Sequence, residues 1–290
     1  MNWTLRQLRL FEAVARLGKL TLAADEQAIS QSAASQALRE LETALGYNLL
    51  VRQGREKVLS NTGQQILPRV RQILQLTQSL ALPDSNAVAG TLRLVASVSI
   101  ACYLLPPMLA DFAKRYPDSH TLMQIDNSRG VLEKVRKGQA QLGLIEGPAL
   151  DAELLIQPWR DDELALFCAP EHALATHSTV SASVLAQQDW IVREQGSGTR
   201  AVLDAALQAR GLVARPRLEL SRQEAIKQSV RAGLGIGCLS AMAIVDEVAA
   251  GQVIRLNTDL DLRRRFAWVC SPEQRQQPLV RAFIEQLQAG

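Results

Sequence analysis

Apolar residues near the start of the chain recur every three or four positions and predict a set of short helices. One apolar helical face runs through residues 5–15, and Gly18 marks its end because glycine readily adopts the left-handed conformation of a helix C-cap. Thr21 is a suitable N-cap for a second short helix. After a tight connection, Ser30 can cap a third helix that continues to about residues 45–46.

The third predicted helix has two chemically different faces. Its buried stripe consists of Ala34, Leu38, Leu41 and Leu45. Its opposite face presents short or flexible polar side chains, namely Gln31, Ser32, Ser35, Gln36 and Arg39. A merely solvated face would more often carry Glu and Lys, whereas base edges in the major groove are read by amide, hydroxyl and guanidinium groups. The pattern favours a helix-turn-helix, and an ordinary three-helix bundle is the alternative.

Residues 49–60 contain two short apolar strands around a glycine-containing turn, which predicts a β-hairpin. The turn region carries Arg52, Arg55 and Lys57, so its tip is cationic and suited to phosphate or minor-groove contact. Solvated turn charges are the alternative interpretation. Beside a helix-turn-helix we interpret the hairpin as a wing, so residues 1–60 form a predicted winged helix-turn-helix with Thr21 among its candidate DNA contacts.

A further helix is predicted over residues 61–82. Ile66, Ile73 and Leu80 lie seven positions apart, with Val70 and Thr77 interleaved as the second seam position. A heptad seam requires a partner helix, so this segment is interpreted as a dimerisation linker helix, with packing against its own chain as the alternative. Residues 83–90 form a short polar hinge.

From residue 91 onward strands and helices alternate, which predicts an α/β domain with a mostly parallel sheet covered by helices. Ligands bind such sheets beyond the carboxyl ends of the strands, near helix N-termini. Three strand ends carry the candidates Ser97, Ser99, Asn127, Ser128, Glu146 and Gly147.

A fourth strand end, at residues 190–193, precedes a glycine-rich loop and the start of a helix. The loop contains Gly196, Ser197, Gly198, Thr199 and Arg200. Exposed backbone N–H groups, hydroxyls and a guanidinium suit a carboxylate or oxyanion, and a simple capped helix start is the alternative. Glu146 would disfavour a highly charged anion unless it is paired with Arg200.

Composition separates the two halves of the chain. The 290 residues suit two or three domains, and 47% hydrophobic with 21% charged residues is typical of a globular protein. Residues 1–82 hold ten Lys and Arg against six Asp and Glu, whereas the remainder holds 22 against 23. A basic N-terminal module beside a near-neutral body fits nucleic-acid binding.

Several function classes lack their sequence signals. The chain shows no apolar run of roughly 20 residues and no signal peptide, so a cytoplasmic protein without a membrane partner is expected. The four cysteines are scattered singly and the histidines lack ligand spacing, so no metal or other cofactor is predicted. The glycines of residues 233–237 follow a helix instead of opening one, so they are not a dinucleotide fingerprint.

Taken in order, these segments resemble the LysR-type transcriptional regulators. The resemblance is carried by Phe11-x-x-Val14-Ala15, Leu20-Thr21-Leu22-Ala23-Ala24, the run from Ile29 to Glu42, Leu49-Leu50-Val51-Arg52 and Leu59-Ser60-Asn61-Thr62-Gly63. It implies pairing through the linker helix, often with assembly into tetramers. It also implies a two-lobed effector domain similar to periplasmic binding proteins over residues 91–290. Lobe I would comprise 91–161 and 267–290, and lobe II 162–266.

The resemblance further implies an effector held between the lobes, where the four candidate segments would converge. Ser221 joins them as part of the segment that returns toward lobe I. The combination of residues 193–200 with Glu224-Ala225-Ile226-Lys227 is similar to the branch that senses sulfur oxyanions or small carboxylated and phosphorylated metabolites.

The sequence therefore predicts a DNA-binding transcription regulator that responds to a small anionic metabolite or inorganic oxyanion. Its expected partners are double-stranded DNA with a roughly palindromic operator and further copies of itself as a homodimer or homotetramer, with RNA polymerase as a candidate partner. Two alternatives remain. A solute-binding or transport protein would fit the body alone, and an α/β enzyme with a DNA-binding segment would need a nucleophile that the motifs do not show.

Overall fold

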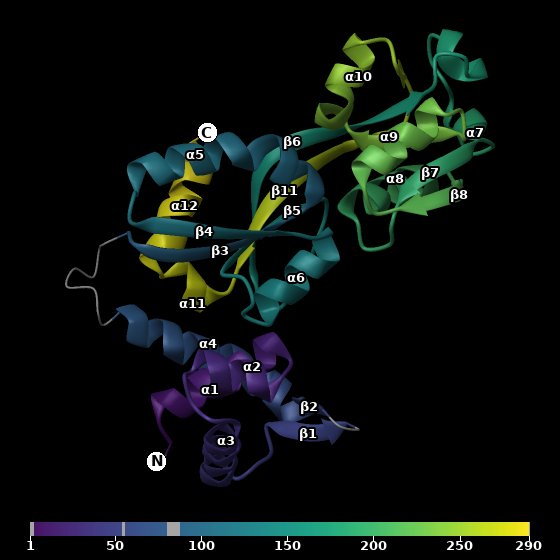
Figure 1. Ribbon diagram of the computed structural model, residues 1–290. Coiled ribbons are helices and arrows are strands. Elements are labelled where there is room, and N and C mark those ends of the chain that lie inside the picture. Colours follow the sequence, from purple (N-terminus) through teal and green to yellow (C-terminus); the bar gives the residue numbers. More distant parts are fainter. Residues whose placement is uncertain (1–2, 54–55, 80–87, 290) are drawn as a thin grey trace. The chain divides into compact units, whose positions relative to one another are not determined.

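The computed structural model describes residues 3–53, 56–79 and 88–289. Within these ranges the chain forms two compact units, an N-terminal one that precedes Val88 and a larger one that holds most of the rest. Figure 1 shows the first as a helical cluster with a small hairpin and the second as a long twisted sheet with helices on its faces. No helix of the described ranges is both long and apolar enough to cross a membrane.

Three helices form the framework of the N-terminal unit, and glycines end two of them. They are α1 (Leu5–Leu17), α2 (Leu20–Glu26) and α3 (Gln31–Leu45). Gly18 and Gly46 cap α1 and α3 in the left-handed conformation, at φ 71° and 81°. The Ser30 hydroxyl accepts a hydrogen bond from the Ala33 amide at the start of α3, so the predicted cap is confirmed.

The predicted cap of α2 is wrong. The helix begins at Leu20, and Lys19 is its N-cap residue without a capping side chain, so Thr21 lies inside the first turn and is exposed. The following turn is tight because Ala28 adopts a positive φ of 51°. This turn sets α2 against α3, and the two share an apolar core with α1 that includes Phe11, Leu38 and Leu41.

A hairpin and a long helix complete the N-terminal unit. Strands β1 (Leu50–Gln53) and β2 (Glu56–Leu59) pair antiparallel, and α4 spans Asn61–Ser79 with Pro68 inside it. Val70 is buried in the core of this unit, and Ile66 and Ile73 pack against the same core. The seam of the predicted dimerisation helix is thus used in part within its own unit, which was the alternative. Leu80 and the hinge to residue 87 lie outside the described residues.

The larger unit contains a nine-stranded sheet with the order β4-β3-β5-β11-β6-β9-β7-β8 and with β10 beside β6. Its strands are β3 (Gly90–Ala96), β4 (Ser119–Ile125), β5 (Leu142–Glu146), β6 (Leu155–Cys168), β7 (Asp189–Arg193), β8 (Arg215–Leu220), β9 (Ile236–Ser240), β10 (Ile254–Leu256) and β11 (Arg263–Cys270).

The helices between these strands are α5 (Leu105–Arg115), α6 (Ser128–Arg136), α7 (Ala182–Leu185), α8 (Gly198–Gln208), α9 (Gln223–Arg231), α10 (Val245–Ala249), α11 (Pro272–Arg275) and α12 (Pro278–Ala289). A π-helical turn, η1 (Ile100–Leu104), precedes α5, and two 3-10 turns are η2 (Ala173–Thr176) and η3 (Ala241–Ile244).

The sheet is parallel at its two ends and antiparallel in its middle. Strands β4, β3 and β5 run parallel to one another, as do β8, β7 and β9. The long strands β6 and β11 run antiparallel to each other and join the two ends (Figure 1). The prediction of a mostly parallel sheet therefore holds for each end, and the two connecting strands depart from it.

Separate apolar cores cover the two ends of this sheet, so the unit has two lobes. One core includes Phe112, Trp268 and Phe283, and the other includes Trp190, Leu203 and Cys238. The long strands β6 and β11 run through both lobes and connect them. We call these two strands the hinge of the effector unit, as distinct from the polar hinge predicted at residues 83–90. The two-lobed fold predicted from the sequence is confirmed.

Candidate functional site

The polar face of α3 lies on the surface of the N-terminal unit. Gln31, Ser32, Gln36 and Arg39 are exposed and Ser35 is half-buried. Arg39 donates to the Ser35 hydroxyl at 3.1 Å, and the Gln36 amide donates to Glu40 at 3.1 Å. The face thus offers hydroxyl, amide and guanidinium groups that are partly ordered by neighbours one turn away, which suits the reading of base edges.

The hairpin adds a pair of like charges. Arg52 on β1 and Lys57 on β2 are directly opposite each other in the antiparallel register. Directly opposed side chains point to the same side of a hairpin, where two cations destabilise the pairing. Such a pair is typical of a surface that contacts phosphate. Arg55, the third candidate of the hairpin, lies outside the described residues.

The candidates of the larger unit converge where strands of both lobes end. Ser97 and Ser99 follow β3, Asn127 and Ser128 follow β4, and Glu146 closes β5, so their parallel strands bring them to one edge. From the other lobe, the loop before α8 reaches this edge. The side-chain amide of Asn127 donates to the Glu194 carboxylate at 3.1 Å, and the backbone N–H of Arg129 donates to the Gly196 carbonyl at 3.1 Å.

The carboxylate of Glu146 lies at the centre of this inter-lobe site. Its Oε1 accepts the backbone N–H of Ser99 at 2.8 Å. Its Oε2 accepts the Thr199 hydroxyl at 3.2 Å and the Arg264 guanidinium at 2.7 Å. Glu146 is 2% exposed, so this carboxylate is held in the interior by donors from both lobes and the hinge.

Arg264 is a member of the site that the sequence reasoning missed. Its side chain is fully buried between the Glu146 carboxylate and that of Asp162, to which its Nε donates at 2.6 Å. It also donates to the Thr199 hydroxyl at 3.0 Å. Gln223, at the start of α9, was missed as well and donates to the Ser99 hydroxyl at 2.8 Å.

The ionisation of Glu146 follows from this arrangement. Burial by itself would raise the pKa of the carboxyl, but the charge of Arg264 and the hydrogen bonds from the Ser97 hydroxyl and the Ser99 amide hold the pKa below its usual value. Glu146 is therefore an ionised acceptor at neutral pH. Its cationic partner is Arg264, and not Arg200, the partner that the sequence analysis had considered.

Ser97 contributes a buried hydroxyl beside the Glu146 carboxylate. The residue is 3% exposed. Its hydroxyl donates to the carboxylate and so helps to hold the pKa of Glu146 below its usual value.

The backbones of the two lobes approach each other closely at Gly198, the first residue of α8. A Cβ at this position would lie 1.7 Å from the Glu146 carbonyl oxygen, so only glycine allows the approach. Gly147 faces Gly198 at φ 81°. Ser197 is the N-cap residue of α8, but its side chain forms no capping hydrogen bond. The alternative of a capped helix start therefore holds for the position of Ser197, although its side chain does not supply the cap.

Two of the predicted effector contacts have other roles in the structure. Arg200 turns away from Glu146 and bonds to the carboxylates of Asp204, at 2.8 Å, and Glu219, at 3.4 Å. Its charge is thus already compensated by residues of its own lobe. Ser221 is exposed before α9 and stands apart from the hydrogen bonds around Glu146, whereas Ser128 supports them by donating to the Glu146 carbonyl at 2.9 Å.

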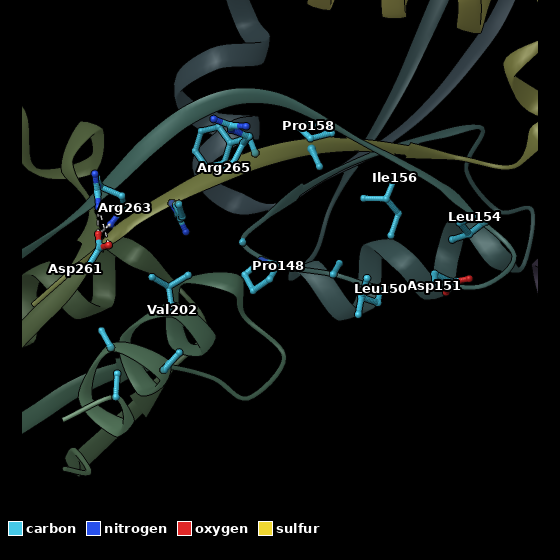
Figure 2. A pocket seen from close by; sticks show the side chains of 18 residues that line it. Pro148, Leu150, Asp151, Leu154, Ile156, Pro158, Val202, Asp261, Arg263 and Arg265 are labelled. Carbon is cyan, nitrogen blue, oxygen red and sulfur yellow. Dashed lines mark hydrogen bonds and ion pairs between the residues drawn. The ribbon is translucent and has the colours of Figure 1, made fainter. Parts of the chain in front are cut away.

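A separate groove of about 790 Å³ lies beside the hinge (Figure 2). Its walls are mostly apolar and come from the loop after β5, the start of β6 and α8, with Arg263 and Arg265 of β11 at one end. Of the candidate effector residues predicted from the sequence, Gly147 lines it, and so does Arg264 of the inter-lobe site. The groove therefore adjoins the polar inter-lobe site.

Comparisons with known proteins agree with a DNA-binding unit followed by a ligand-binding one. Residues 5–64 match the bacterial regulatory helix-turn-helix protein family of lysR type, and residues 85–290 match the LysR substrate binding domain. The HTH-type transcriptional regulator YeiE of Escherichia coli is 37% identical over 271 residues, which cover 92% of this chain and 91% of that protein.

Two solved structures place the fold. A full-length OxyR variant from Pseudomonas aeruginosa matches all of this chain and 94% of its own, with a TM-score of 0.79 and 22% identity. The regulatory domain of Synechocystis CcmR in complex with 2-PG covers 69% of this chain and 96% of its own, with a TM-score of 0.64 and 28% identity. The protein is a transcription regulator and not an enzyme, and it belongs to the LysR family.

Proposed function

We propose that this LysR-family regulator binds specific DNA sites through α3 and the hairpin, and that a small anionic effector bound between its lobes modulates the binding or bending of that DNA. In this proposal the DNA-binding domain comprises residues 1–60, the linker helix 61–82 and the effector domain 91–290. The regulator acts in the cytoplasm as a homodimer or homotetramer on a roughly palindromic operator.

One observation carries the assignment of an anionic effector. The site already holds a carboxylate, that of Glu146, with a backbone N–H, a hydroxyl and a guanidinium as donors. These donors come from lobe I, lobe II and the hinge respectively. A donor set that stabilises one buried carboxylate is chemically suited to another anion, and the match to a domain solved with 2-PG supports a small ligand in this domain.

The same contacts explain how an effector would act. Ser99 and Glu146 belong to one lobe and Thr199 to the other, so an anion that recruits the Thr199 hydroxyl changes a bond that joins the lobes. The difference in contact free energy between the two lobe arrangements is what can shift their equilibrium. The hinge strands β6 and β11 transmit that shift to the rest of the chain.

Thr199→Val tests the effector site because it removes the hydroxyl and keeps the shape. We expect operator binding to persist, while the effector concentration needed for the response rises about tenfold, the usual cost of one hydrogen bond to a charged group. Thr179→Val, at an exposed position of the same lobe, is the matched control. An unchanged response in the Thr199 variant would remove this hydroxyl from the site.

Alanine at Gln36 or Arg39 tests the DNA surface. We expect the affinity for an operator, obtained by genomic selection with the purified protein, to fall about tenfold or more, with a smaller effect on unrelated DNA. Arg9→Ala removes an exposed arginine from α1 and controls for loss of charge alone. Equal losses on operator and unrelated DNA would show that α3 contributes charge but no base reading.

A further inference from the structure

The groove beside the hinge is lined by both lobes (Figure 2). Pro148 and Leu150 of the loop after β5 line it from lobe I, and Val202 and Ala205 of α8 line it from lobe II. Residues of β6 and β11 complete the lining. Its volume of about 790 Å³ lies within the range of roughly 300–1,000 Å³ that is usual for small-molecule pockets. The groove is therefore large enough for a ligand that touches both lobes.

Much of the apolar lining of the groove is exposed to water. Leu150 is 99% exposed, and Pro158 and Ala205 are exposed as well. Exposed apolar residues that occur singly need no explanation, but these three line one concave surface. Each CH₂ group that a ligand buries against such a surface contributes about fourfold in affinity. The lining therefore favours a ligand with an apolar body.

The two ends of the groove differ in charge. Arg263 and Arg265 lie at one end, whereas Asp151 lies beside Leu150 at the other (Figure 2). Asp261 compensates the charge of Arg263, which donates to it through two nitrogens at 2.8 Å each. An anionic group on a ligand is thus repelled from the Asp151 end and attracted toward Arg265.

Most of the hydrogen-bond donors of Arg265 are available to a ligand. Its Nε donates to Asp161 at 2.6 Å, and its side chain forms no other hydrogen bond with the described residues. The two terminal nitrogens therefore retain four N–H donors in the planar arrangement that matches a carboxylate. Because the Arg265–Asp161 pair is exposed, an added carboxylate does not have to break a strong ion pair.

We propose that the groove is a second ligand site, which binds an unbranched carboxylate of medium chain length. The carboxylate bonds to Arg265, and the alkyl chain runs along Pro158 toward Ile156. The register of the hinge strands sets the length of that chain, because Ile156 is paired with Val269, four residues beyond Arg265. Four residues of a strand span about 13 Å, the length of an extended chain of about eight to ten carbon atoms.

The two lobes meet through such a ligand, which gives the site a regulatory role. A ligand that contacts the loop after β5 and α8 together stabilises the lobe arrangement in which both walls reach it. This role goes beyond the effector proposed beside Glu146, since the polar contacts around that carboxylate need not change when the groove is filled.

Octanoate, butanoate and octanol form a matched set of probes. In titration calorimetry on the full-length protein, octanoate should bind one site per chain. Its affinity should exceed that of butanoate, which has four fewer CH₂ groups, by at least about tenfold. It should exceed that of octanol, which lacks the charge that bonds to Arg265, by about tenfold as well. Equal affinities for octanoate and octanol would overturn the inference, and so would the absence of saturable octanoate binding at millimolar concentration.

Variants on α8 and β11 locate the site. Ala205→Phe places a ring in the groove and should abolish octanoate binding, whereas Gln208→Phe, at an exposed position of the same helix outside the groove, should leave it unchanged. Arg265→Gln should lower the affinity for octanoate about tenfold and leave that for octanol unchanged. Unchanged octanoate binding by the Ala205 variant would place the ligand elsewhere and refute the assignment.

Sedimentation of the Ala205→Phe variant tests a different occupant of the groove. The variant and the wild type should assemble to the same extent. If the variant assembles less and the wild type fails to bind octanoate, the groove is a contact between copies of the chain and the proposed ligand site is wrong.

Discussion

Replacement of Arg264 by methionine removes the one cation that Glu146 and Asp162 share. The wild-type guanidinium donates to both carboxylates, at 2.7 Å and 2.6 Å, and lies 5.0 Å from the centre of the Phe266 ring. Methionine fills a similar volume but neutralises neither carboxylate. The variant therefore leaves two carboxylates, 2% and 4% exposed, without their counter-ion.

The magnitude follows from the cost of an unpaired buried charge. Breaking a buried ion pair by removing one partner destabilises a protein by about 3–5 kcal/mol, and the loss of hydrogen bonds to Thr199 adds to the same cost. Combining Arg264→Met with Glu146→Gln removes part of the uncompensated charge. The double variant should therefore lose less stability than the sum of the single variants, by roughly 1–3 kcal/mol.

The pH dependence of the two proteins should differ in sign. In the wild type the pKa of Glu146 is below its usual 4.5, so Glu146 contributes stability that is present above pH 4.5 and is lost as the pH falls through the folded-state pKa. In the variant, burial without Arg264 raises that pKa, so ionised Glu146 opposes folding above pH 4.5. The difference in stability between the two proteins should shrink as the pH is lowered from about 7 toward 5.

Urea unfolding followed by tryptophan fluorescence measures this difference. Trp190 and Trp268 are fully buried in the two lobes, so their emission reports the unfolding of the effector unit. A loss below about 1 kcal/mol at pH 7, with the same pH profile as the wild type, would show that Arg264 does not stabilise a buried carboxylate pair.

Three further perturbations test other parts of the structure. Gly198→Ala places a Cβ 1.7 Å from the Glu146 carbonyl, so it should force the lobes apart and destabilise the effector unit by about 1–3 kcal/mol in urea unfolding; wild-type stability would refute the close approach. Leu38→Ala in the core of the N-terminal unit should lower the free energy of unfolding of that unit by about 2–5 kcal/mol. Operator binding should be lost at the temperature where the unit unfolds, and circular dichroism can follow that unfolding. Exposed Cys102 should react with a thiol reagent in the native protein at about pH 8, whereas burial raises the pKa of three other thiols and should protect them until denaturation. These are Cys168 and Cys270, each with a pKa of about 11, and Cys238, with a pKa of about 12.

Local patterns in the sequence predicted the N-terminal unit well because its elements depend on nearby residues. The apolar stripe of α3 and its Ser30 cap both follow from spacing within one helix. The Thr21 cap failed because Leu20 packs against the core and α2 starts with Lys19 as its N-cap residue, two residues earlier than predicted, so tertiary packing overrode the preference for a capping side chain. A heptad seam gives the direction of an apolar face but not the identity of its partner.

The inter-lobe site could be predicted only as far as strand ends indicate it. Glu146 and Thr199 follow from the rule for carboxyl ends of parallel strands, but Arg264 lies 118 residues beyond Glu146 in the chain. Its place depends on the register of β11 against β6, which no local pattern specifies. The role of Arg200 could have been anticipated, since Asp204 stands four residues further along the same helix, the spacing of an intrahelical ion pair.

The register of the hinge strands has a consequence for the response of the protein to salt. Residues 263–265, all arginines, lie opposite residues 163–161, which are acidic, and alternate side chains of a strand point to opposite faces. Arg264 is buried on one face, whereas the Arg265 to Asp161 pair on the other is more than half exposed. Dissolved ions screen exposed charges and reach buried ones far less. Rising ionic strength should therefore weaken the exposed Arg265–Asp161 pair and leave the buried Arg264–Asp162 pair intact. The direction in which the two strands bend most easily should then depend on the salt concentration.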